Sequence, residues 1–220
     1  MHRVSLLQKN NRKKGFTLVE VLVSVTIFTV VAIVGITAVI VAKSAYEKNQ
    51  AIRATSDSLM FILDDISRTA RLGDYYRCID QNLINLQDTG TPLDGQNCRG
   101  VSFEPFWNID PDSSEDQLIY IFAETVDPET NESMGALFAR SLDDQSLDSI
   151  DVSGESFQRI TPRNINIDIS RSGFDIIGAE DFTSQPRIIM RIYGEIVERN
   201  QTTQISLQTT ISQRAIRVEP

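Results

Sequence analysis

The feature that most constrains this chain is an apolar run from Phe16 to Ala42, which is 27 residues long and contains one charged residue, Glu20. A helix needs only about 20 such residues to cross a bilayer, so the run predicts a membrane-spanning helix. Glu20 is unusual there, because an acid inside a membrane costs roughly 2.5–3.5 kcal/mol and is expected to have a partner. The run holds no Lys, Arg or His. The partner must therefore come from elsewhere.

A cut after Gly15 would supply a partner. Phe16 would then carry a free α-amino group four residues before Glu20, on the same face of a helix that starts at Phe16. The two charges can pair within one chain or between neighbouring chains. The alternative is that Glu20 lies near the lipid headgroups and is solvated there.

The residues before the run, 1–15, form a basic leader with five Lys or Arg and no acid. Basic flanks stay cytoplasmic, so the C-terminal body is expected on the other side of the membrane. Removal of the leader would change the formal net charge from −9 to −14, which disfavours direct nucleic-acid binding. A conventional signal peptide has an apolar core of only about 7–15 residues, although Ile36-Thr37-Ala38 imitates its cleavage site.

The string Gly15-Phe16-Thr17-Leu18-Val19-Glu20 resembles the prepilin-type cleavage and methylation motif of type IV pilins and pseudopilins. The resemblance implies that a prepilin peptidase cuts after Gly15 and methylates the new N-terminus at Phe16. It also implies that Glu20 guides the subunit into a helical filament. The implied partners are other pilin or pseudopilin subunits, the peptidase, an inner-membrane platform protein and, indirectly, a motor ATPase.

The helix is expected to continue far beyond the membrane run, from residue 16 to residue 72, because no proline occurs before Pro92. Residues 16–42 form its membrane-spanning half and residues 43–73 its amphipathic half, with Gly73 as the stop. Six apolar residues recur at helical spacings and predict a buried stripe: Ile52, Leu59, Ile62, Leu63, Ile66 and Ala70.

Residues 74–220 are predicted to form a globular, β-rich domain. Its first part, 74–117, is rich in glycine and proline and is expected to be an irregular connection with short strands at most. Phe106 and Trp107 are expected in the core, and the alternative is that they form a partner-binding patch. Strands are then predicted at 118–123, 136–142, 165–169, 187–197 and 203–211. The last two suggest an antiparallel hairpin around Asn200, with the earlier of them broken at Gly194. The fold class is α+β: a long N-terminal helix packed on an antiparallel sheet, as in pilins.

Cys78 and Cys98 are the only cysteines. In an exported domain, two cysteines predict a disulfide, which would be worth roughly 3 kcal/mol here in the chain-entropy model. The alternative is two independent buried thiols.

The only histidine, His2, lies in the leader, which argues against catalytic triads and against zinc sites that use histidine. One loop alternates oxygen-bearing side chains that calcium can use: Asp110, Asp112, Ser114 and Asp116. It lacks the glycine and the distant glutamate of an EF-hand, so a solvated acidic loop is the main expectation and no cofactor is predicted.

Together these features predict a non-enzymatic minor pilin or pseudopilin of a pilus, type II secretion or DNA-uptake filament. It would sit in the inner membrane with its body extracytoplasmic until assembly. One alternative is a single-pass anchored binding domain that is never cut. Another is an anchored hydrolase, but no recognisable set of catalytic residues supports it.

Overall fold

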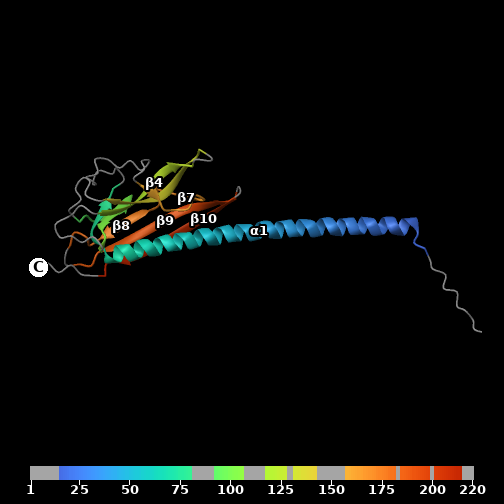
Figure 1. Ribbon diagram of the computed structural model, residues 1–220, viewed down its shortest axis with the longest axis horizontal. Helices are drawn as coiled ribbons and strands as arrows, with labels where there is room; N and C mark the ends of the chain where they lie inside the picture. The colour runs from blue at the N-terminus through green and yellow to red at the C-terminus, as the bar shows by residue number, and fades with distance from the viewer. Residues whose placement is uncertain are drawn as a thin grey trace, which may run out of the picture. The chain divides into compact units, whose positions relative to one another are not determined.

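The computed structural model describes residues 15–80, 92–106, 117–127, 131–142, 157–181, 184–198 and 201–214. Its main elements are one long helix and ten strands (Figure 1): α1 (Leu18–Leu72), β1 (Asp74–Ile79), β2 (Gly95–Cys98), β3 (Gly100–Glu104), β4 (Gln117–Val126), β5 (Ser133–Leu142), β6 (Gln158–Arg159), β7 (Ile165–Ile167), β8 (Gly173–Ile177), β9 (Arg187–Glu198) and β10 (Gln201–Ser212). By its internal contacts the chain divides after Asn49 into two compact units.

The first unit contains residues 18–49 of α1, a continuous helix with almost no buried side chain. The predicted helix is confirmed, but it begins at Leu18 rather than at Phe16. The reason is the cap described below, which places Thr17 just outside the helix. Lys43 and Glu47, the first charged residues after the apolar run, form an i,i+4 ion pair of 3.8 Å.

In the second unit, the described strands form two antiparallel five-stranded sheets rather than the one sheet that we expected. The first sheet has the order β1-β3-β4-β5-β6, and the second has the order β10-β9-β8-β2, with β7 also paired to β9. The hairpin of β9 and β10 is confirmed and runs in register from Gln201–Glu198 to Ser212–Arg187. β9 is not broken at Gly194. The missing side chain there lets β7 approach, because a Cβ would lie 2.5 Å from the Asn166 carbonyl oxygen.

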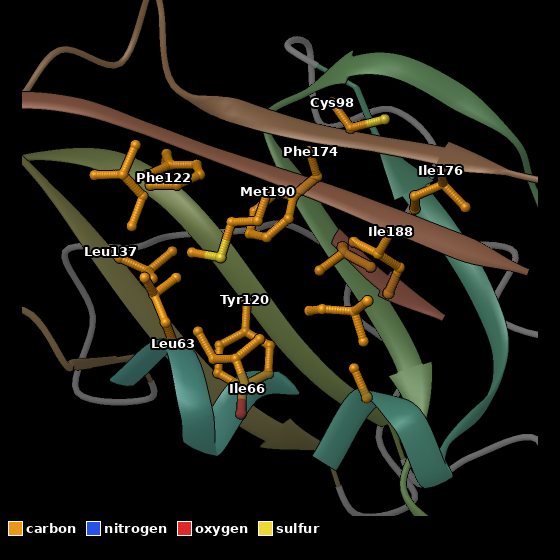
Figure 2. Packing of buried hydrophobic residues seen from close by; sticks show 14 of the residues in the cluster. Leu63, Ile66, Cys98, Tyr120, Phe122, Leu137, Phe174, Ile176, Ile188 and Met190 are labelled. Carbon is orange, nitrogen blue, oxygen red and sulfur yellow. The ribbon is translucent and has the colours of Figure 1, made fainter. Parts of the chain in front are cut away.

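One hydrophobic core joins the helix to both sheets. Its helical members are Leu59, Leu63, Ile66 and Ala70, with Ile52 and Ile62 partly buried beside them, so the predicted stripe is confirmed. Figure 2 shows Leu63 and Ile66 pointing at side chains from the sheets, such as Tyr120 and Met190. A second, smaller cluster, which includes Ile119, Phe138 and Phe157, is built around strands of the first sheet.

The described residues of the segment 74–117 contain three short strands, β1, β2 and β3, so this part of the chain is more regular than the connection with at most short strands that we expected. These strands are short, and backbone irregularities interrupt the pairing of β1 with β3 and of β2 with β8. Tyr75 and Asn97 also take positive φ angles, of 53° and 54°. Such interruptions remove the alternation by which strands are recognised in a sequence. Phe106 is 48% exposed rather than part of the core, and Trp107 lies outside the described residues.

Candidate functional site at the start of the helix

A side-chain cap fixes where the helix begins. The Thr17 hydroxyl oxygen accepts a hydrogen bond from the backbone N–H of Glu20 at 3.3 Å, and the Thr17 carbonyl accepts from Val21 N–H at 3.2 Å. Thr17 is therefore the N-cap, and Glu20 is the third helical residue. A Thr followed three residues later by Glu, just before an apolar run, is the spacing of a capping box. The sequence carries this signal, which we did not use to place the start of the helix.

The Glu20 carboxylate lies in the first turn of α1, where a negative charge interacts favourably with the helix dipole. Among the described residues, no cationic side chain pairs with it, and Lys43 is the first cation that follows it in the chain. The local helix end therefore favours a carboxylate at this position without neutralising it.

The other polar side chains of the run are satisfied by the helix itself. The hydroxyls of Ser24, Thr26 and Thr29 donate to carbonyls three or four residues earlier, at 2.7–2.8 Å. Thr37 does the same toward Ile33 at 3.0 Å. Hydroxyls bonded in this way do not oppose insertion into lipid. Glu20 is left as the side chain of this run that needs a partner from outside.

Gly15 and Phe16 precede the helix and are exposed; Phe16 is 79% exposed. Nothing in the fold requires glycine at position 15, because a Cβ added there would have no neighbour within 4 Å. Gly15 is also not in the positive-φ region that favours glycine. The glycine therefore has no role in folding that the structure reveals.

The large apolar side chains from Phe16 to Val41 are exposed in the first unit, and α1 is long and apolar enough to cross a membrane. Soluble proteins rarely expose contiguous apolar patches of more than a few hundred Å². This surface is consistent with single-pass anchoring in a bilayer.

The remaining predicted site residues belong to the second unit. Cys78 and Cys98 form the predicted disulfide, with a Cα–Cα distance of 5.5 Å. It joins β1 of the first sheet to β2 of the second. Gly95 lies against it, since a Cβ there would be 2.3 Å from Cys78 Sγ. The calcium candidates Asp110, Asp112, Ser114 and Asp116 lie outside the described residues, so that site stays a prediction. The residues that are described hold no cluster of three or more potential metal ligands.

Comparison with known proteins gives a match that covers the start of the chain's helix and the residues before it. Residues 10–42 match the family model of the prokaryotic N-terminal methylation motif. No curated protein and no solved structure is significantly similar to the chain. The match covers the apolar run and the basic residues immediately before it, and it ends where the amphipathic half of α1 begins.

Proposed function

Because residues 10–42 carry the prepilin signal of type IV pilins and pseudopilins, we propose that this chain is a minor pilin or pseudopilin of a type IV pilus-like filament. A prepilin peptidase cuts it after Gly15 and methylates Phe16. The subunit waits in the inner membrane with its body extracytoplasmic. It is then extracted into a filament with other pilin-like subunits, through a platform protein that a motor ATPase drives.

The observation that carries this proposal is the isolated Glu20 carboxylate. In a bilayer it needs a cation, and the apolar run from Phe16 to Ala42 provides none. Cleavage after Gly15 creates an ammonium group at Phe16, two residues before the first residue of α1. Phe16 lies outside the helix in the uncut chain. After the cut, the new ammonium group can meet Glu20 of its own chain or of a neighbouring helix.

Gly15 supports the same proposal from another side. A glycine that the fold does not use is consistent with recognition by a processing enzyme, for which a residue without a side chain offers easy backbone access. The position of the glycine immediately before the exposed Phe16 leaves the bond between them accessible.

The assignment to a minor subunit rests on the body. It consists of two sheets, a disulfide and several short irregular strands. This body is large and irregular for a subunit that repeats along a whole filament. The mechanical role of the subunit is to present this body on a helix that is anchored in the filament. That role requires no catalytic group.

The intact mass of the protein extracted from its native membrane tests the proposal. We expect a chain that starts at Phe16 and carries one added methyl group. A Gly15→Val variant provides the control, because a branched side chain at the cleaved bond should leave the leader attached. An intact wild-type N-terminus in cells that contain the peptidase would instead support a single-pass anchored extracytoplasmic binding domain. A cut near Ala38 would indicate an exported soluble domain.

A further inference from the structure

In the described part of the chain, the outer edge of β10 has no strand paired to it and lacks the sequence features that usually protect a strand edge. β10 pairs with β9 over twelve residues without a bulge, and no other strand within the described part of the chain pairs with its far side. Residues 201–213 contain no charged residue, no proline and no glycine, in a chain that is 23% charged. Natural proteins usually protect edge strands with charges, prolines, bulges or short length, because a free edge can add another strand.

A groove of about 950 Å³ runs along this edge and is bounded on its other side by α1. Four consecutive residues of β10, Leu207–Thr210, line it. Successive side chains of a strand point to opposite faces, so a groove that touches four in a row follows the backbone edge rather than one face. On the helix, the lining residues Met60, Asp64 and Arg68 recur at four-residue spacing and form one face.

Some apolar side chains that border the groove are not fully buried. In β9, the inward-facing Met190 and Ile192 are buried, whereas Ile205 and Leu207 of β10 are only partly buried. Met60, on the helical wall, is 58% exposed. A strand added about 4.8 Å beyond β10 would place its inward side chains over Leu207 and Met60.

One end of the groove is basic. Arg214 N–H donates to the Arg71 carbonyl at 2.8 Å, which fixes the end of the β10 segment to the end of the helix. Both arginines are exposed and line the groove. Neither has a carboxylate partner among the described residues, whereas their neighbour Arg68 is paired with Asp64 at 2.9 Å.

We propose that this groove binds an extended segment of a different polypeptide as an additional strand of the second sheet. The segment has alternating apolar side chains, which cover Leu207 and Met60, and an acidic side chain, which pairs with Arg71 and Arg214. The positions from Leu207 to Ser212 span about 17 Å, which suits a segment of about six residues. A second copy of β10 fits poorly, because residues 201–213 offer no carboxylate to the two arginines. This inference does not depend on the proposed function.

Peptide binding to the full chain in detergent tests the proposal. The probe is a fluorescent peptide of about eight residues with alternating valine and threonine and one glutamate near one end, with both termini blocked so that the glutamate is its only acid. A second peptide has glutamine instead, and a third has a central proline, which cannot pair. We expect the glutamate peptide to bind at least tenfold more tightly than the glutamine peptide, and the proline peptide not to bind.

Two variants of β10 make the test specific. Thr209→Lys places a charge inside the groove and should weaken binding at least tenfold. Ser206→Lys adds the same charge on the opposite, exposed face and should leave binding unchanged. The double variant Arg71→Ala, Arg214→Ala should bind the glutamate and glutamine peptides equally. Unchanged thermal unfolding of each variant would confirm that it is folded.

Three results would overturn the proposal. One is no binding of the glutamate peptide at about 1 mM. Another is equal weakening by Thr209→Lys and Ser206→Lys. The third is self-association of the chain that Thr209→Lys abolishes, which would make a second copy the occupant.

Discussion

Thr55 of α1 and Asn164, in the segment between β6 and β7, form a hydrogen bond in which the Asn164 amide donates to the Thr55 hydroxyl at 2.8 Å. Thr55 is 4% exposed. The Asn164 carbonyl in turn accepts from Val197 N–H at 2.8 Å, so one loop residue links the helix to β9. This link lies near the start of the buried stripe of α1.

Thr55→Val should destabilise the second unit by about 1–3 kcal/mol, because it keeps the shape of the side chain but leaves the Asn164 amide without its acceptor. Ser58→Ala is the control, since the Ser58 hydroxyl donates to the Ala54 carbonyl of its own helix and removing it leaves no group of another described segment without its partner. Urea unfolding of the two variants in detergent would measure the difference. Equal midpoints would show that the Thr55 contact contributes no net stability.

The disulfide should contribute more than this single hydrogen bond. Replacement of Cys78 and Cys98 by alanine frees a loop whose ends are 20 residues apart, and we expect a loss of about 3 kcal/mol. Because the bond joins β1 to β2, the loss should come with weaker protection from hydrogen exchange in both strands. A double variant as stable as the wild type would contradict this.

High pH should destabilise the body through Tyr76. Its hydroxyl lies within hydrogen-bonding distance of the carbonyls of Ala70 and Gly73, at the end of α1. Burial, and secondly the nearby charge of Asp74, raises the pKa of Tyr76. An unfolded tyrosine has a pKa of about 10, so the unfolded state loses this proton first as the pH rises. The contribution of Tyr76 to stability should therefore be fully present below about pH 10 and be lost progressively above it.

The measurement is the urea midpoint from pH 8 to pH 11. Above about pH 10, the wild type should lose up to about 1.4 kcal/mol per pH unit more than Tyr76→Phe, which cannot titrate. The pKa of Tyr120 is also raised, first by burial, so Tyr76→Phe should keep part of the alkaline loss. Identical slopes for wild type and Tyr76→Phe would be inconsistent with this account.

The sequence predicted well where one physical signal dominates a long stretch. The helix, its buried stripe and the alternating strand β10 follow from periodicity that runs over many residues. It predicted poorly where structure depends on contacts between distant segments. The second sheet is held by pairings such as that of β2 with β8, which are about 80 residues apart.

At the candidate site, too, local sequence signals were predicted better than contacts between distant segments. The residues from Gly15 to Glu20 were identified from the sequence, and the motif comparison confirms the signal that they carry. The start of the helix was placed two residues too early, because the cap at Thr17 was overlooked. The groove beside β10 was not foreseen at all, since it exists only where the helix lies next to a strand that follows it by more than a hundred residues.

Gly135 lies where the two sheets approach each other closely. A Cβ at this position of β5 would lie 1.9 Å from the Ile167 carbonyl oxygen of β7. Since backbone atoms cannot move aside cheaply, Gly135→Ala should cost about 3 kcal/mol. Gly35→Ala is the matched control, because a Cβ there meets nothing within 4 Å. Unfolding midpoints of both variants would test this, and a neutral Gly135→Ala would show that the sheets can separate locally at little cost.

The role of Glu20 can be separated from its place in the helix cap. We expect Glu20→Gln to be cut after Gly15 as usual but to remain in the membrane fraction instead of entering sheared filaments, because the carboxylate that we propose as the partner of the Phe16 ammonium group is gone. Thr17→Ala removes the cap, which should destabilise the helix by about 1 kcal/mol, but it keeps the carboxylate. This variant should therefore still assemble. Glu47→Gln, which affects a glutamate outside the apolar run, should assemble normally. If Thr17→Ala lost assembly to the same extent as Glu20→Gln, the carboxylate would act by starting the helix rather than by pairing. Normal assembly of Glu20→Gln would remove the main support for the proposed mechanism.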